Sequence, residues 1–335
     1  MTEQRGWVVR RDDESGALTC ALEGFDDGFL GPLHEGEVAV DLHYSSLNYK
    51  DALSLHGRPG IVRRFPLVAG LDVIGEVAAS RDPRWTPGDA VVLCGSTHGE
   101  SRHGGLATRA HVRGAELTAL PSAFTARQAA GIGTAGVTAA IAAAHLTDHG
   151  LRPGDGPVVV TGAGGGVGSF AIRLLAAEGF EVVAATGRPG ELGERLRELG
   201  AAEVVDRAEL AGGDRPLLAE RFAGGVDSVG GPILAGILAR LRRGGAVAAC
   251  GMAASTELPT TVLPFILRGV ALLGVNAVHQ SPELRARTWE LLAKDVPGRL
   301  VDSLTRVVHL DGAQEAAAEL LAGRGTGRVV VDVRA

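Results

Sequence analysis

The chain has 335 residues, of which 45% are hydrophobic and 21% charged, and its formal net charge is −6. This length suits two domains, and the apolar content is sufficient for well-packed cores. No basic stripe interleaved with aromatic residues is found, so the composition argues against a nucleic-acid partner.

The N-terminal residues lack an apolar signal-like core, and no apolar run approaches the length of a membrane span. Cys20, Cys94 and Cys250 are far apart and odd in number, which argues against a disulfide framework or a zinc knuckle. A cytoplasmic protein without a membrane partner is therefore expected.

The first 125 residues are typical of a β-rich domain, because short apolar strands alternate with turns of glycine and proline. Residues 45–52, SSLNYKDA, concentrate polar groups just after the first of these strands, and loops at strand ends commonly carry catalytic groups. We expect catalytic roles for Tyr49 and Asn48, with Lys50 and Asp51 bracing the loop. The predicted strands cover 36–44, 70–79, 90–94 and 106–112.

A catalytic zinc site of the alcohol dehydrogenase kind needs a cysteine on this early loop and a His-Glu pair near the next strand. The corresponding places here hold Asn48 and Gly70-Leu71-Asp72. His98 and His103 have ligand-like spacing but lack a cysteine partner in their own loop, so no metal is expected. The polar loop 98–105 that contains them is predicted either to line a pocket or to be an ordinary solvated loop.

From residue 125 the pattern changes to helices and then to alternating strands and helices. Six strands separated by helices favour a doubly wound parallel sheet. Helices are predicted at 125–129, 137–146, 167–178, 190–199, 215–222 and 232–242, and strands at 158–161, 181–185, 203–205, 226–229, 246–250 and 270–275. Helices at 282–292 and 313–321 and a closing strand at 327–333 follow.

Residues 158–188 contain the most informative motif, an apolar strand that enters a glycine cluster and continues as a helix and a second strand. Glycines allow a tight turn and let backbone N–H groups approach a pyrophosphate at the helix N-terminus. The second strand ends in Thr186-Gly187-Arg188 with no carboxylate. Because an arginine suits a ribose 2′-phosphate, NADPH is predicted rather than NADH, with Arg207 as a second candidate ligand for that phosphate.

Cys250-Gly251-Met252 ends a predicted strand at the sheet edge where open α/β sheets bind ligands. The following residues 258–268, with two prolines and an apolar stripe, are predicted to cover the nicotinamide or to pack between domains. A β-rich domain interrupted by a dinucleotide fold is the simplest architecture. The predicted boundaries are 1–130 and 278–335 for the catalytic domain and 131–277 for the NADP-binding domain.

SSLNYKDAL (45–53), VRRFPLVAGLD (62–72), GIGTAGVTA (131–139), VVVTGAGGGVGS (158–169), CGM (250–252) and LPTTVLPFILRGVALLGVNAV (258–278) together span nearly the whole chain. In these segments the chain resembles the zinc-independent medium-chain dehydrogenase/reductase superfamily, and within it the acrylyl-CoA reductase (quinone oxidoreductase) group. The resemblance implies an α/β fold with a GroES-like β-rich catalytic domain and an inserted Rossmann domain, and a homodimer paired around residues 272–278.

The resemblance also implies which residues contact NADPH. Two of them, Ala277 and Gly323, replace polar residues and could contact the cofactor only through backbone. Arg102-His103-Gly104-Gly105 replaces a family His-Trp-Gly-Gly, which affects the substrate prediction more than the cofactor prediction. The implied contacts are Tyr49, Gly164, Gly165, Gly166, Val167, Thr186, Gly187, Arg188, Arg207, Met252, Ile266, Ala277 and Gly323.

The predicted function is NADPH-dependent reduction of the C=C bond of an α,β-unsaturated acyl-CoA, with acryloyl-CoA giving propanoyl-CoA. The proton at the α-carbon is expected from Tyr49 or from water, Tyr49 in the second case only packing against the nicotinamide. Reduction of quinones or enones and a non-catalytic NADPH-binding sensor are the alternatives. Arg63, Arg64 and Arg268 are candidates for the CoA phosphates, by charge alone.

Overall fold

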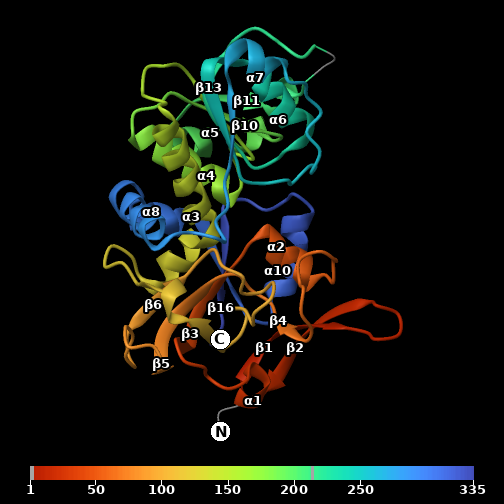
Figure 1. The fold of residues 1–335 in the computed structure, drawn as a ribbon, viewed down its shortest axis with the longest axis vertical. Coiled ribbons are helices and arrows are strands. Elements are labelled where there is room, and N and C mark those ends of the chain that lie inside the picture. Colours follow the sequence, from red (N-terminus) through yellow and green to blue (C-terminus); the bar gives the residue numbers. More distant parts are fainter. Residues whose placement is uncertain (1–3, 213–214) are drawn as a thin grey trace. The chain divides into compact units, whose positions relative to one another are not determined.

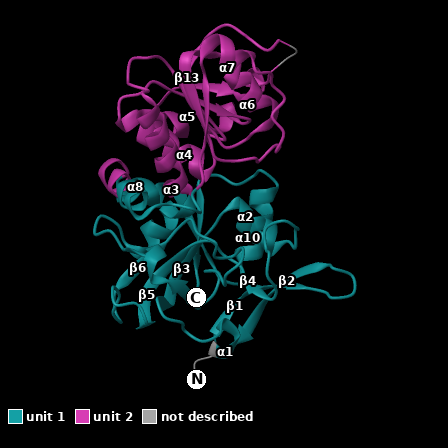
Figure 2. Ribbon diagram, in the orientation of Figure 1, with its two compact units in different colours: residues 1–134, 277–289, 297–335 teal, residues 135–276, 290–296 magenta. Residues whose placement is uncertain are grey.

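The computed structural model describes residues 4–212 and 215–335, which form two compact units. The first contains residues 1–134, 277–289 and 297–335, and the second residues 135–276 and 290–296 (Figure 2). These divisions at 134/135 and 276/277 lie close to the predicted boundaries at 130/131 and 277/278, but residues 290–296, predicted in the catalytic domain, belong to the second unit.

The first unit is built on two β-sheets (Figure 1). The smaller sheet has the order β2-β1-β4, from strands Leu18–Phe25, Gln4–Arg11 and Leu67–Val68. The larger has the order β15-β16-β3-β5-β6-β8, and β7 also pairs with β3. Its strands are β3 (Glu37–Leu47), β5 (Val73–Ser80), β6 (Ala90–Leu93), β7 (Arg109–Arg113), β8 (Thr118–Ala119), β15 (Thr305–His309) and β16 (Arg328–Asp332).

Helix α2 (Tyr49–Leu55) contacts α10 (Ala313–Leu321) in this unit. Strand residues such as Val40, Val73 and Val331 are fully buried with α2 residues Ala52 and Leu55 in one apolar core, so α2 is fixed against the large sheet. The other helical segments are α1 (Asp27–Leu30), η1 (Gly114–Glu116), α8 (Pro282–Asp295, which crosses the boundary between the units) and α9 (Gly298–Leu304).

The second unit is a six-stranded parallel sheet in the order β11-β10-β9-β12-β13-β14. The chain builds outward from β9 to β11 and then returns to place β12 on the other side of β9, which creates a topological switch point. Its strands are β9 (Val158–Thr161), β10 (Val182–Thr186), β11 (Ala201–Asp206), β12 (Phe222–Asp227), β13 (Leu241–Ala249) and β14 (Ala271–Gly274). Its helical segments are α4 (Gly166–Ala177), α5 (Pro189–Glu198), η2 (Arg207–Leu210), α6 (Gly231–Leu238) and α7 (Leu263–Arg268).

These sheets confirm the predicted fold class of a β-rich GroES-like domain with a doubly wound parallel-sheet domain. The predicted helix at 215–222 is wrong. The backbone N–H groups of Leu218 and Arg221 donate to Ala239 O and Arg240 O at 2.9 and 2.8 Å, instead of to carbonyls one helical turn earlier. The predicted helix 232–242 ends at Leu238, because Leu241 pairs with Phe222 as the start of β13.

Several elements of the first unit were not predicted. Strands β1 and β2 form an antiparallel pair, with an Arg10–Glu23 ion pair of 2.7 Å between them, and β15 pairs with β16. The expected loop 45–52 continues β3 as far as Leu47 and then begins helix α2. Tyr49 is therefore the first residue of a helix.

Helix α3 (Ala126–His149) replaces the two separate helices expected at 125–129 and 137–146, and non-helical Gly133 interrupts it. Within the described residues it is the one helix whose length and mean hydropathy of 1.4 would suffice to cross a membrane, which corrects the expectation that no apolar run reaches that length. Because 89% of that apolar window is buried inside the protein, its composition is that of a core helix.

Candidate active site

The glycine cluster forms the turn between β9 and α4 in the second unit. The backbone of Gly162 has φ +59°, and a Cβ on Gly168 would lie 2.3 Å from Gly162 O. Glycine at the first position therefore permits the turn, and glycine at the second lets α4 pack against it. The N-cap of α4 is Gly165, which has no side chain to accept from the first turn, so the N–H groups of that turn remain for an anion. The predicted cofactor residues Gly164, Gly165, Gly166 and Val167 are half-buried in this turn.

A buried hydrogen-bonded pair, Thr161 and Asp227, holds the carboxyl ends of β9 and β12 together at the switch point. Thr161 Oγ1 donates to Asp227 Oδ1 at 2.6 Å, and Asp227 Oδ2 accepts from Gly230 N at 2.7 Å. Both side chains are fully buried, and burial raises the pKa of Asp227. The sequence interpretation missed this pair, although Asp227 ends an otherwise apolar strand.

The residues predicted to bind a 2′-phosphate lie at the carboxyl ends of β10 and β11. Thr186 Oγ1 accepts from Arg188 N at 3.2 Å, and the Arg188 guanidinium forms an ion pair of 3.1 Å with Glu191. The Arg207 side chain lies over Gly187, where an added Cβ would be 3.0 Å from its Nε. Two guanidinium groups thus lie next to the tip of β10, and this arrangement suits a dianionic phosphate.

The other predicted cofactor contacts lie in different places. Met252 and Ile266 belong to the second unit, and their exposed fractions of 50% and 70% leave them accessible to a ligand. Ala277 and Gly323 belong to the first unit. The carbonyl oxygen of Ala277 accepts from Gln280 Nε2 at 2.6 Å, and Gly323 follows α10. The contacts of all four with NADPH stay predictions.

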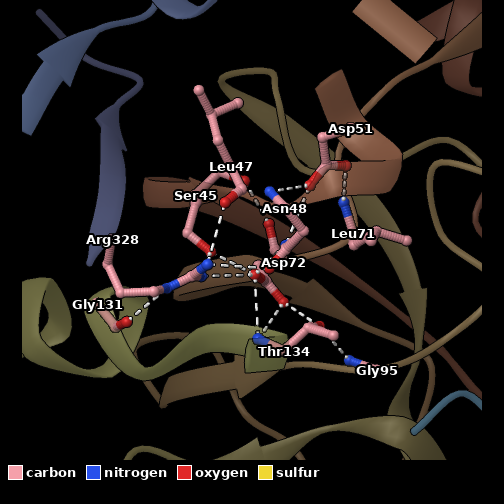
Figure 3. Close-up of polar contacts among 11 residues, drawn as sticks. Ser45, Leu47, Asn48, Asp51, Leu71, Asp72, Gly95, Gly131, Thr134 and Arg328 are labelled. Atoms are coloured by element: carbon pink, nitrogen blue, oxygen red, sulfur yellow. Dashed lines mark hydrogen bonds and ion pairs between the residues drawn. The ribbon is translucent and has the colours of Figure 1, made fainter. Parts of the chain in front are cut away.

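Asp72 is the centre of a buried polar network in the first unit (Figure 3). Its Oδ1 accepts from Thr134 N at 3.0 Å and Thr134 Oγ1 at 2.6 Å, and its Oδ2 accepts from Asn48 Nδ2 at 2.9 Å and from Ser46 Oγ. The carboxylate has no solvent exposure, so these donors replace the water that it loses on folding. The prediction identified Asp72 only as a non-ligand of zinc and did not identify this role.

Arg328, at the start of β16, supplies the positive charge of this network. Its guanidinium lies 3.9 Å from Asp72 Oδ2 and donates to Gly131 O at 2.9 Å, Leu47 O at 3.0 Å, Asn48 Oδ1 at 3.1 Å and Ser46 Oγ at 2.6 Å (Figure 3). Gly133 leaves room for these groups, because a Cβ there would lie 2.6 Å from Arg328 and from Ser46 Oγ. The backbone of Gly133, with φ +50°, is the non-helical point in α3, so this position requires glycine both for its conformation and for space.

Asn48 is held on every polar atom of its side chain. Its amide nitrogen donates to Asp51 Oδ2 at 3.0 Å as well as to Asp72, and its oxygen accepts from Arg328. These contacts favour a positioning role, at the N-cap of α2, over direct contact with a substrate. The predicted catalytic role of Asn48 stays a prediction.

Asp51 closes the first turn of α2. Its Oδ2 accepts from Asn48 N at 2.8 Å and its Oδ1 from Leu71 N at 3.0 Å, which supports the predicted bracing role. Burial, with the negative charge of Asp72 as the next cause, raises the pKa of Asp51 from 3.8 to about 7. A proton on Asp51 therefore relieves the repulsion between two neighbouring carboxylates.

Tyr49 follows Asn48 with an exposed fraction of 41%, and its hydroxyl has no partner among the described residues. Its neighbour Lys50 forms an ion pair of 2.6 Å with Glu100, whose side chain is only 9% exposed. The same Glu100 accepts a hydrogen bond of 2.7 Å from Arg63 N through its backbone oxygen. Glu100 was not singled out as a bracing residue, and the pair it makes with Lys50 joins α2 to the loop 98–105.

The loop 98–105 is not the ordinary solvated loop of one interpretation. His98 is fully buried, its Nδ1 lies 2.9 Å from Ser96 Oγ, and burial lowers its pKa to about 3. His103 Nδ1 accepts from Val68 N at 3.2 Å, and its ring lies against Phe29 with centroids 5.1 Å apart. Both rings therefore have structural partners in their neutral forms.

Two family profiles match the chain. A profile described as alcohol dehydrogenase GroES-like domain covers residues 34–148, and one described as zinc-binding dehydrogenase covers residues 166–294. Acrylyl-CoA reductase AcuI of Ruegeria pomeroyi is 46% identical over 329 residues, which covers 98% of each protein. The chain belongs to the medium-chain dehydrogenase/reductase family.

Two solved relatives in this family have the same fold. The crystal structure of Escherichia coli K-12 YhdH with bound NADPH has a TM-score of 0.92 and 44% identity, and covers 98% of this chain and 99% of that one. Bacillus subtilis YhfP, with bound NAD, has a TM-score of 0.91 and 36% identity over 99% of this chain and 100% of that one. YhfP is named as a candidate quinone oxidoreductase.

Zinc-binding members of the medium-chain dehydrogenase/reductase family raise the question of a metal here. At the place where such a ligand set is expected, the Asp72 carboxylate accepts hydrogen bonds from four donor groups of Ser46, Asn48 and Thr134 and pairs with the Arg328 cation. Every polar atom of the Asn48 side chain is already hydrogen-bonded. These residues do not fit a zinc ion. Among the described residues no group of three or more His, Cys, Asp or Glu side chains is placed to hold a metal.

The pH dependence of stability should reveal the raised pKa of Asp51. Between pH 3.8 and about pH 7 the folded protein retains a proton on Asp51, whereas the unfolded chain has released it. The stabilising contribution of Asp51 is therefore complete below pH 3.8 and is lost as the pH rises through about 7. We expect the unfolding free energy of the wild type, minus that of Asp51→Asn, to decrease over this interval in urea titrations. Parallel profiles for the two proteins would contradict the assignment, and Asp13→Asn is a surface control.

Cofactor choice should depend on the guanidinium groups beside Gly187. If Arg188 and Arg207 bind the 2′-phosphate as predicted, Arg188→Ala and Arg207→Ala each remove a charge-assisted hydrogen bond to it. We then expect KM for NADPH to rise about tenfold and KM for NADH to stay nearly constant. Steady-state kinetics with both cofactors measures this. Arg197→Ala, an exposed change on α5, is the matched control. Equal effects on both cofactors would refute recognition of the phosphate.

Proposed function

We propose that the protein uses NADPH to reduce the C=C bond of an α,β-unsaturated acyl-CoA, with acryloyl-CoA giving propanoyl-CoA. The observation that supports this most strongly is the 46% identity to acrylyl-CoA reductase AcuI over 98% of both chains. The glycine turn, the helix N-terminus of α4 and the two arginines beside Gly187 are suited to hold an NADP cofactor.

When bound, NADPH supplies the hydride that adds to the β-carbon of the acryloyl group. Negative charge then develops on the thioester oxygen, and a proton must reach the α-carbon. Tyr49 is the side chain of this protein best suited to assist, because the residue is 41% exposed, its hydroxyl has no partner among the described residues, and Asn48 fixes the start of its helix. Tyr49 donates the proton itself, or a water molecule does so while Tyr49 packs against the nicotinamide.

Kinetics with a panel of electrophiles tests the proposed substrate. We expect NADPH oxidation with acryloyl-CoA to have a kcat/KM at least about tenfold higher than with benzoquinone or a simple enone. No NADPH oxidation with acryloyl-CoA above background would refute the proposal. Faster turnover of quinones would favour the alternative suggested by the name of YhfP, and no turnover with tight NADPH binding would favour a sensor.

Tyr49→Phe in the same assay distinguishes the two proton sources. Loss of a general acid lowers kcat by roughly 10²- to 10⁴-fold. If the hydroxyl donates the proton, kcat should fall by this amount while the affinity for NADPH stays constant. Unchanged turnover would assign the proton to water.

We also propose a cytoplasmic homodimer. Strand β14 pairs only with β13 among the described strands. Two exposed apolar residues lie at the neighbouring helix α7: Val262, 63% exposed, just before it, and Leu267, 50% exposed, within it. An uncovered sheet edge with apolar residues beside it favours pairing with a second copy. A solution mass of about twice 34.4 kDa would support the dimer, and a monomer mass would refute it.

The proposed cytoplasmic location rests on the cysteines. All three are free, which suits a reducing compartment.

A further inference from the structure

A positively charged segment lies between α2 and β4 in the first unit. We call residues 56–66 the arginine segment, after Arg58, Arg63 and Arg64. From residue 52 to residue 71 the sequence contains these three arginines and one histidine but no aspartate or glutamate. The charge of this stretch is therefore positive, although the net charge of the whole chain is −6.

The three guanidinium groups are free to bind a ligand. Arg58, Arg63 and Arg64 are exposed, and none has an ion-pair or hydrogen-bond partner for its side chain among the described residues. Arg268, the other arginine predicted for this role, is different. Its guanidinium donates to Ala239 O at 2.9 Å and to Leu218 O at 2.6 Å, so it has a structural role, and these contacts argue against a phosphate contact there.

The backbone under these arginines is fixed. Arg58 N donates to Leu53 O at 2.9 Å and Arg63 N to Glu100 O at 2.7 Å, while the Val62 side chain is buried in the core of the unit. Ordering this segment around a ligand therefore costs less conformational entropy than ordering a loose loop. The side chains extend from a preformed support.

Glu100 connects the arginine segment to the candidate active site. Its carboxylate pairs with Lys50, the residue after Tyr49, and its backbone oxygen holds Arg63. The positive charge of Arg64, after burial as the larger cause, lowers the pKa of His103 in the same loop to about 4. The arginines and Tyr49 thus belong to one connected part of the molecule.

We propose that Arg58, Arg63 and Arg64 form the subsite that binds the phosphates of the CoA moiety. This inference rests on the proposed function. Arginine binds phosphate oxygens in bidentate geometry, and the three groups offer several such contacts for the pyrophosphate and the ribose 3′-phosphate of CoA. A quinone or a simple enone has no phosphate, so the subsite would favour acyl-CoA over these electrophiles.

Kinetics of the double variant Arg63→Ala/Arg64→Ala test the subsite with two thioesters. Acryloyl-CoA carries the phosphates, and acryloyl-N-acetylcysteamine does not. We expect KM for acryloyl-CoA to rise about tenfold or more, with kcat and the KM values for the short thioester and for NADPH nearly constant. Added salt should raise KM for acryloyl-CoA less in the variant than in the wild type.

Arg11→Ala/Arg299→Ala removes the same charge from two other exposed positions and is the matched control. An unchanged KM for acryloyl-CoA in the Arg63/Arg64 variant would overturn the subsite, and so would an equal rise for both thioesters. A rise in KM for NADPH alone would mean that the arginines bind the cofactor instead, which also overturns the proposal.

A binding measurement separates this inference from the proposed reaction. Calorimetry with 3′-phospho-ADP, on protein saturated with NADP⁺, measures the phosphate subsite without turnover. If the wild type reduces neither thioester, the proposed function fails. Binding that is weakened in the variant would still support the subsite, whereas no binding or equal binding would overturn it.

Discussion

The buried ion pair of Asp72 and Arg328 is the interaction on which the first unit of this protein depends. Removing two charges from water is costly, and the attraction between them repays that cost only when the remaining polar atoms are satisfied. Here Ser46, Asn48 and Thr134 satisfy Asp72, and the backbone oxygens of Leu47 and Gly131 help to satisfy Arg328. The pair thereby joins the end of β3, the start of α2, the first turns of α3 and the C-terminal strand β16.

Each unit contains a fully buried aspartate, and the two units satisfy its carboxylate with different partners. In the second unit, no arginine of the described residues forms an ion pair with the buried carboxylate of Asp227. This carboxylate instead accepts hydrogen bonds from Thr161 and Gly230, at the point where β9 and β12 diverge. In both units a buried carboxylate fixes the place where a strand gives way to a functional segment. Rigid support of this kind holds a reactive group in place before the reaction, so no further conformational entropy is lost in ordering it during the reaction.

The charges of the molecule are arranged around the ligands proposed for it. The chain is acidic as a whole, yet Arg188 and Arg207 lie beside Gly187, and the arginine segment lies beside α2. Local positive charge on an otherwise acidic protein directs anionic ligands to particular places. The cofactor and the acyl-CoA are both anions, so this distribution suits the proposed reaction.

The sequence by itself determined the parallel-sheet unit, the glycine turn and the family, because each depends on residues that are close together in the chain. Val158 to Gly168 contains its own strand, turn and helix start, so local periodicity was enough. The resemblance at residues 45–53 and 258–278 added the proposed substrate class. Residues 215–222 were misassigned as a helix because their backbone partners lie about twenty residues away at Ala239 and Arg240.

Only the tertiary structure decided which polar groups act together. Ser46, Asp72, Thr134 and Arg328 are separated by up to 282 residues, and no spacing rule relates them. It also showed that Asn48 is fully committed to hydrogen bonds, that His98 is buried and that Arg268 is a structural group, whereas Arg63 and Arg64 are free. Burial and long-range partners set the chemistry of a charged side chain, and both become known only when the chain is folded.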